Sequence, residues 1–231
     1  MTGFAPDLDT ATELCARGQT VLLTATRVDD LETPVSAYLK LASHNANTFL
    51  LESVEGGAFR GRYSAIGLDP DLIWRCRGDQ AEIAHAPAPG VAPGAFEPCA
   101  EKPLHALRKL IAESRLTLPS GLPPISAGLF GYLGYDMIRL VEKLPDVNPD
   151  PINLPDAVMM RPSVVVVIDG VKGEITVISP AWAADGQNAV PNQSFGIHLQ
   201  TDSSNNVVGV AASIQDAAGL RNVVAGNQND G

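Results

Sequence analysis

The stretch FLLESVEGGAFRGRYSAIGLDP, residues 49–70, decides the fold that we expect for this chain. From residue 47 to residue 54 the sequence alternates as a strand does. The segment Glu55-Gly56-Gly57 breaks that alternation, and a second extended segment begins at Tyr63 and continues to Leu68. We therefore predict two strands joined by a glycine-rich loop.

Polar side chains gather at one edge of this predicted pair. The first strand ends in Leu51-Glu52-Ser53, and the second opens with Arg62-Tyr63. A carboxylate, a hydroxyl and a guanidinium placed there could hold the ammonium and carboxylate groups of an amino acid. Equally, Glu52 and Arg62 could pair with each other across the strands. The spacing alone leaves both interpretations open.

Further strands with short connections are predicted up to residue 180. Residues 73–77 and 80–83 flank Gly78-Asp79, a two-residue turn typical of a hairpin. The other predicted strands are residues 20–28, 125–135, 164–169 and 174–178, the last two forming a hairpin around Gly170. Short loops in place of crossover helices favour an α+β fold with mostly antiparallel β-sheets and a few helices.

Three helices are expected between these strands. Thr33-Pro34 is typical of a helix start, and four residues of that helix share one face: Val35, Tyr38, Leu39 and Ala42. Pro103 opens a second helix, with Leu104, Leu107 and Ile111 expected to face inward. A short third helix is predicted at residues 136–143, and the Pro- and Gly-rich residues 86–98 are predicted to form a surface loop.

Composition excludes several classes of partner. The chain has 231 residues, 45% of them hydrophobic, with 26 acidic against 16 basic residues and a net charge of −10. Such a surface repels phosphate backbones and anionic lipids, so we expect no nucleic-acid partner and no membrane partner. Cys15, Cys76 and Cys99 fit neither a disulfide framework nor a zinc site. Together with the absence of a secretory signal or long apolar run, they predict a cytoplasmic protein with reduced thiols.

No catalytic or metal-binding constellation is visible in the sequence. The four histidines lie far apart, and none has the spacing of a metal ligand. The glycines of GLFGYLG, residues 128–134, have the wrong spacing for a dinucleotide-binding loop. We interpret them as allowing close packing of a neighbouring backbone against a strand.

The composition changes after Pro180. Residues 181–231 contain seven Asn and five Gln, a single Arg, and neither Lys nor Glu. Because such a segment has little apolar surface to offset the entropy of ordering, we expect a largely disordered tail, in which Val207-Val208 could still form a short strand. The expected organisation is one domain over residues 1–180 and this unmatched polar tail over 181–231.

Four segments resemble the N-terminal region of anthranilate synthase component I. They are residues 49–57, residues 61–70, residues 128–139 and residues 155–162, and they occur in the family's order and with roughly its spacing. The similarity extends from about Thr20 to Pro180. It implies the α+β fold of that N-terminal domain.

The resemblance also implies a ligand. Leu51-Glu52-Ser53 is similar to the family motif that binds feedback L-tryptophan. By that resemblance, Ser53 and Glu52 would lie against the ammonium and indole groups of tryptophan, while Arg62 and Tyr63 would complete the wall. Residues of the family's C-terminal domain complete the pocket, so this chain would hold half a site.

The family's reaction requires more than this chain contains. Full-length members are lyases that convert chorismate and ammonia into anthranilate and pyruvate, with Mg²⁺ as cofactor and a glutamine amidotransferase subunit as partner. The residues that bind Mg²⁺ and chorismate belong to a C-terminal domain that nothing in residues 181–231 resembles. We therefore expect no catalytic residues, no cofactor and no synthase activity in this chain alone.

Two alternatives remain open from the sequence. One is the corresponding part of aminodeoxychorismate synthase component I, the sister family of folate biosynthesis, although the sequence of residues 50–57 and 62–70 resembles anthranilate synthase more closely. The other is a non-enzymatic module that binds an amino acid or a partner subunit and so regulates an intact enzyme.

Overall fold

A computed structural model describes residues 4–28, 31–42, 46–53, 61–87, 91–145, 149–182, 199–202 and 205–208. Its α-helices are α1 (Leu8–Ala16), α2 (Pro34–Ala42) and α3 (Pro103–Glu113), with 3-10 helices η1 (Pro124–Ser126) and η2 (Tyr135–Leu140). The strands are β1 (Val21–Val28), β2 (Phe49–Leu51), β3 (Tyr63–Arg77), β4 (Gln80–His85), β5 (Glu97–Pro98), β6 (Phe130–Leu133), β7 (Ala157–Asp169), β8 (Glu174–Ala181), β9 (Leu199–Asp202) and β10 (Asn205–Val208).

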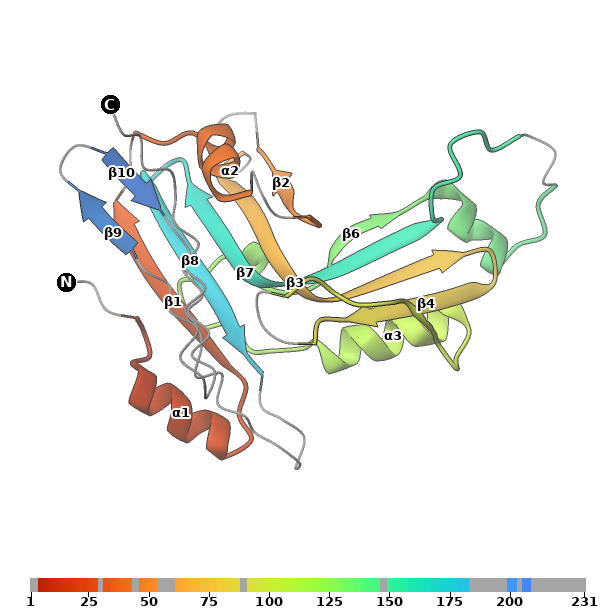
Figure 1. Ribbon diagram of the computed structural model, residues 1–231, viewed down its shortest axis with the longest axis horizontal. Coiled ribbons are helices and arrows are strands. Elements are labelled where there is room, and N and C mark those ends of the chain that lie inside the picture. Colours follow the sequence, from red (N-terminus) through yellow and green to blue (C-terminus); the bar gives the residue numbers. More distant parts are fainter. Residues whose placement is uncertain are drawn as a thin grey trace. The chain divides into compact units, whose positions relative to one another are not determined.

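Eight of these strands form one sheet (Figure 1). Its order is β1-β8-β7-β3-β4-β5, with β2 paired to β3 and β6 paired to β7. Six pairings, β1–β8, β2–β3, β3–β4, β4–β5, β6–β7 and β7–β8, are antiparallel. The predicted α+β class with mostly antiparallel sheets is therefore confirmed.

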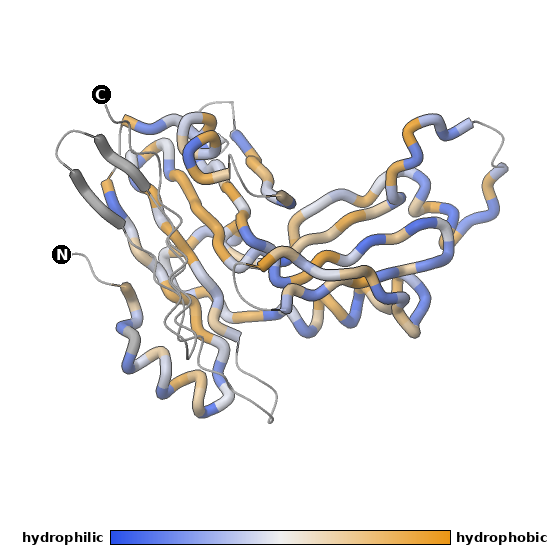
Figure 2. The backbone as a smooth tube through the Cα atoms, viewed as in Figure 1, coloured by the Kyte–Doolittle hydropathy of each residue, from blue (hydrophilic) through white to orange (hydrophobic). Residues whose placement is uncertain are grey.

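The chain divides into two compact units, and the long strands β3 and β7 contribute to both. Unit 1 comprises Met1–Asp69, Leu118–Ala127 and Ser163–Gly231. Its core lies between α2 and the centre of the sheet, where apolar side chains from β3, β7 and β8 meet the helix. Many residues of these strands are strongly hydrophobic, as the colours along the backbone show (Figure 2). The fully buried members of that core are Ile66, Leu68, Val164, Val166 and Val177, each contributing roughly 1.5–3 kcal/mol on burial.

Reciprocal hydrogen bonds fix the start of α2. The Ser36 backbone N–H donates to Thr33 Oγ1 at 3.1 Å, and the Thr33 N–H donates to Ser36 Oγ at 2.9 Å. This arrangement satisfies helix-end donors and confirms the predicted Thr33-Pro34 start. The predicted face of the helix is only partly right. Ala42 is buried and Tyr38 packs against the core, but Val35 and Leu39 are 44% and 62% exposed, and Ala37 is buried as well.

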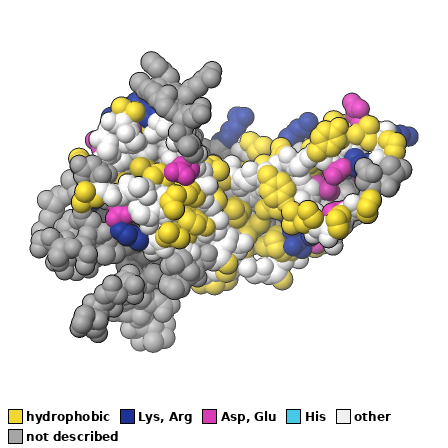
Figure 3. Space-filling model, turned by 90° about the horizontal axis from the view of Figure 1, so that it is seen from above, with side chains coloured by type: hydrophobic (Ala, Val, Ile, Leu, Met, Phe, Trp, Pro, Cys, Tyr) yellow, Lys and Arg dark blue, Asp and Glu magenta, His cyan; other side chains and the backbone are white. Residues whose placement is uncertain are grey.

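Unit 2 comprises Pro70–Thr117 and Gly128–Pro162. Helix α3 packs on one face of its strands, around the buried Trp74 and Cys76. The predicted hairpin is confirmed as β3–β4, with Gly78 at φ +54° in the turn. Figure 3 views the unit from above, where hydrophobic side chains are exposed on its surface. Tyr132 and Leu133 of β6 belong to the exposed hydrophobic residues, at 43% and 54%.

The inward face predicted for α3 is only partly right. Leu107 is buried at 7% exposure, as expected, but Ile111 is 45% exposed and Leu110, at 4%, takes its place in the core. Leu104 is intermediate. In both α2 and α3, apolar residues fall on two neighbouring stripes that are one position apart. Packing against the sheet decides which of the two stripes is buried.

Two other local predictions need correction, and one helix is absent from the prediction. The strand predicted at residues 125–135 is confined to β6, because η1 and η2 occupy its two ends, and the short helix predicted at 136–143 is the 3-10 helix η2. Helix α1, capped by Asp7, whose Oδ1 accepts from the Thr10 N–H at 2.8 Å, was not predicted. The packing role of the glycines is confirmed at Gly131, where a Cβ atom would lie 1.9 Å from the Val158 carbonyl oxygen.

The polar tail contributes one described feature. Strands β9 and β10 pair antiparallel, with Val208 opposite Leu199, so a short strand does form at Val207-Val208. Residues 183–198 and 209–231, to which the expectation of disorder mainly applies, lie outside the described residues.

Candidate functional site

The predicted site lies where β2 meets the start of β3, within unit 1. The two strands pair antiparallel with Phe49 opposite Gly67 and Leu51 opposite Ala65. The ring of Phe49 covers Gly67 so closely that a Cβ atom there would lie 2.1 Å from it. Glycine at position 67 therefore lets this aromatic side chain lie flat on the neighbouring strand and anchor the short β2.

Beyond Leu51 the first strand leaves the sheet. Glu52 and Ser53 are both exposed and fall outside the strand, which ends three residues earlier than predicted. The Ser53 backbone N–H donates to the hydroxyl of Ser64 at 3.2 Å. A side chain thus takes the hydrogen bond that a strand residue would have offered to the backbone of β3. The glycine-rich loop predicted to follow, residues 54–60, lies outside the described residues.

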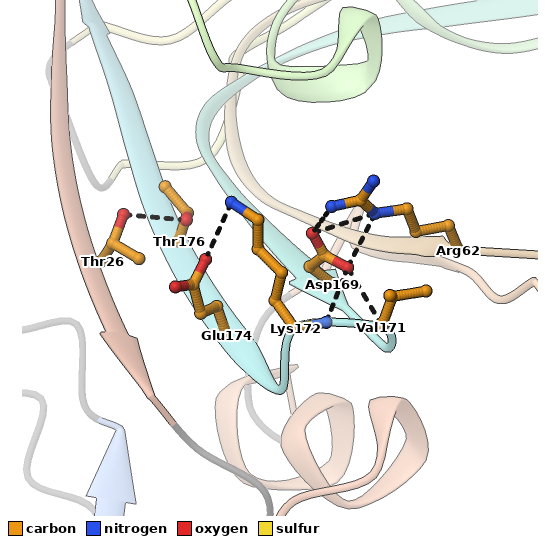
Figure 4. A network of polar contacts seen from close by, with 7 residues as sticks. All are labelled: Thr26, Arg62, Asp169, Val171, Lys172, Glu174 and Thr176. Atoms are coloured by element: carbon orange, nitrogen blue, oxygen red, sulfur yellow. Dashed lines mark hydrogen bonds and ion pairs between the residues drawn. The ribbon is translucent and has the colours of Figure 1, made fainter. Parts of the chain in front are cut away.

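The guanidinium of Arg62 is committed to a carboxylate that the sequence analysis did not identify (Figure 4). Arg62 Nε donates to both oxygens of Asp169, at 2.9 and 3.1 Å, and Nη2 donates to Oδ2 at 2.6 Å. The Glu52–Arg62 pair considered from the sequence is therefore not what forms: Arg62 pairs with Asp169 at the end of β7. Only the tertiary fold brings these residues together, since 107 positions separate them.

Asp169 also organises the turn between β7 and β8. Its Oδ1 accepts from the backbone N–H groups of Val171 at 3.0 Å and Lys172 at 3.2 Å, and the Gly170 N–H donates to the carbonyl of Arg62 at 2.9 Å. The hydrogen bonds from Arg62 lower the pKa of the Asp169 carboxyl and, reciprocally, raise the pKa of Arg62. The pair stays ionised and ties the turn to the residue just before β3.

Tyr63 completes the arrangement beside Arg62. The Arg62 guanidinium carbon lies 4.9 Å from the centre of the Tyr63 ring, within the range of a cation–π contact. Of the five residues proposed from the sequence, Leu51 ends β2, and Glu52 and Ser53 follow it. Arg62 precedes β3, the strand paired with β2, and Tyr63 is its first residue. Glu52 and Ser53 present their side chains to solvent, whereas the Arg62 guanidinium already has a carboxylate partner.

Other polar features of the described chain lie elsewhere. A hollow of about 350 Å³ runs along Thr26, Arg27, Val28 and Glu174, and none of the five proposed residues lines it. In unit 2, Arg161 Nε donates to Asp71 at 2.8 and 3.0 Å and Nη1 donates to Ser114, a second fork that joins a strand to the end of α3. These contacts of Arg161 join elements within unit 2.

Within the described ranges, no three side chains of the His, Cys, Asp and Glu types lie close enough together to hold a metal ion. The Mg²⁺ implied by the resemblance therefore finds no fitting set of ligands in this part of the chain. None of the described helices has the length and hydropathy needed to cross a membrane.

Comparison with known proteins shows where related sequences occur. No family model matches the chain. Anthranilate synthase component 1 of Cereibacter sphaeroides is 58% identical over 172 residues, which are 74% of this chain and 34% of that protein. The proteins of the same name from Mycolicibacterium smegmatis and Pseudomonas aeruginosa are 39% and 42% identical, over 66% and 64% of this chain and 28% and 30% of their own lengths.

A solved structure is also similar. The crystal structure of anthranilate synthase component I from Streptococcus pneumoniae TIGR4 matches with a TM-score of 0.44 and 25% sequence identity, covering 69% of this chain and 32% of that one. The sequence comparisons confirm the resemblance inferred from the four motifs. This chain is therefore a homologue of anthranilate synthase component 1, and it spans about a third of the length of these relatives.

Proposed function

We propose that this chain is the N-terminal, regulatory portion of anthranilate synthase component I and that it holds feedback L-tryptophan at the edge formed by Leu51, Glu52 and Ser53. The observation that carries the proposal is the exposure of Glu52 and Ser53 directly after β2, at a point where the strand has left the sheet. Free side chains on a fixed backbone are what recognition of a small zwitterion requires.

The five residues would have different roles. The Glu52 carboxylate would pair with the ammonium group of tryptophan, and the Ser53 hydroxyl would bond to the same end of the ligand. Tyr63, with the Arg62 guanidinium against its ring at 4.9 Å, would present a flat wall to the indole. Because Arg62 is held by Asp169, we assign it to this wall and to support of the β7–β8 turn, while Leu51 would add apolar contact as the last residue of β2.

The activity proposed for the whole family protein is conversion of chorismate and ammonia into anthranilate and pyruvate in L-tryptophan biosynthesis. A glutamine amidotransferase subunit would supply the ammonia, and Mg²⁺ would bind to the C-terminal domain of the full-length family protein. The relatives are named for anthranilate synthase, which favours this pathway over the folate-pathway alternative. For this chain alone we propose tryptophan binding without synthase activity.

Calorimetric titration of the full chain with L-tryptophan tests the proposal. We expect saturable binding that Ser53→Ala weakens by at least tenfold, since it removes the hydroxyl of an exposed residue without disturbing a core. Ser120→Ala, which alters another exposed serine of unit 1, is the matched control and should bind like the original chain. Absence of binding by a chain whose circular dichroism shows folded β-structure would contradict the proposal.

A further inference from the structure

We propose that Ser64 is the positioning residue of this site, holding Ser53 in the place from which it binds the ligand. The inference rests on the proposed function and adds a residue that touches no ligand. Its basis is the single hydrogen bond, 3.2 Å long, by which the Ser64 hydroxyl accepts the backbone N–H of Ser53.

The register of β2 and β3 shows why this bond matters. Phe49, Leu50 and Leu51 pair with Gly67, Ile66 and Ala65 in an unbroken antiparallel ladder. Continued by two residues, the same ladder would place Ser53 opposite Tyr63 and draw its backbone into the sheet. The ladder stops at Leu51 instead, and the Ser53 N–H turns to a side chain.

Burial makes Ser64 a rigid support. Its side chain is only 5% exposed, between Tyr63 and the fully buried Ala65 on a strand that belongs to the core of unit 1. Ser53, in contrast, is exposed. A hydroxyl fixed in the core therefore holds a backbone group at the surface, and this is how a site residue outside regular structure is kept in one position. Without that support, the segment after β2 would have to be ordered when the ligand binds, at a cost in affinity.

Titration of L-tryptophan into variants of the full chain tests this role. Ser64→Ala and Ser64→Cys remove or weaken the acceptor at nearly constant volume, and each should lower affinity about three- to tenfold, the size expected for one hydrogen bond. Ser64→Thr keeps the hydroxyl and should restore affinity to within about twofold of the original chain. Ser179→Ala, which removes a fully buried hydroxyl bonded to the Ser163 carbonyl on β7, is the control and should leave affinity unchanged.

Amide hydrogen exchange at Ser53 supplies a second measurement. Exchange should be slowed in the original chain and in Ser64→Thr, and faster in Ser64→Ala, whether or not ligand is present. Equal affinity of the original chain and Ser64→Ala would overturn this inference and leave the proposed function standing. Loss of affinity without faster exchange at Ser53 would also overturn it. Failure of the folded original chain to bind tryptophan at all would overturn the proposed function and this inference with it.

Discussion

At the scale of single residues, the ion pair between Arg62 and Asp169 stabilises the part of unit 1 beside the candidate site. Asp169→Asn keeps an oxygen for the N–H groups of Val171 and Lys172 but removes the charge that Arg62 binds. We expect the free energy of unfolding at pH 7 to fall by about 1–2 kcal/mol, because a partly buried guanidinium loses its carboxylate. Urea denaturation of both proteins measures this difference.

The pH dependence of that difference has a definite sign. Since Arg62 lowers the pKa of Asp169 in the folded chain, the stabilisation is present above the unfolded pKa of an aspartate, about 3.9, and is lost as pH falls through the lower folded value. The gap between the original chain and Asp169→Asn should therefore narrow toward pH 3. Glu174→Gln, which alters the more exposed pair of Glu174 with Lys172 at 3.5 Å, should cost under about 0.5 kcal/mol. A gap that stays constant with pH would contradict this account.

At the scale of elements, helix α3 shows that the sheet, not the helix, chooses the buried stripe. Leu110 is 4% exposed and packs in the core of unit 2, whereas the neighbouring Ile111 is 45% exposed. Leu110→Ala should lower the free energy of unfolding by about 2–5 kcal/mol, the usual cost of a cavity in a packed core. Ile111→Ala, the matched control, should cost under about 1 kcal/mol. Thermal and urea unfolding of the two variants measure this difference. Equal losses of stability would contradict the assignment of Leu110, and not Ile111, to the buried stripe.

At the scale of the whole molecule, strand β7 is the centre of the sheet, with β8 and β3 as its neighbours. Its residues from Val164 to Ile168 are between 0% and 6% exposed. Exposing these amides to solvent requires separation of β7 from both β8 and β3. We therefore expect them to exchange most slowly and to report global unfolding. Amides of α1, a surface helix beside β1, should exchange much faster. Exchange measured by NMR or mass spectrometry would contradict this if α1 were as protected as β7.

The sequence predicted those elements whose pattern is local. The hairpin around Gly78 is confirmed because a glycine with positive φ suits its two-residue turn. The start of α2 is confirmed because Thr33 caps its own helix. The strand predicted at residues 125–135 forms only at β6, since apolar composition does not separate a strand from 3-10 turns at its ends. For α1, the missed signal was the capping residue Asp7.

The candidate site likewise has features that the sequence predicts and features that only the fold decides. The sequence by itself determined the family resemblance, and from it the candidate residues Leu51, Glu52, Ser53, Arg62 and Tyr63 were predicted, because these follow one another along two adjoining segments. Only the tertiary structure decided that Arg62 binds Asp169, across 107 positions, and that Ser64 holds the Ser53 backbone. The physical reason is that hydrogen bonds between distant residues depend on strand order and register, which arise from packing of the whole sheet and not from any local pattern.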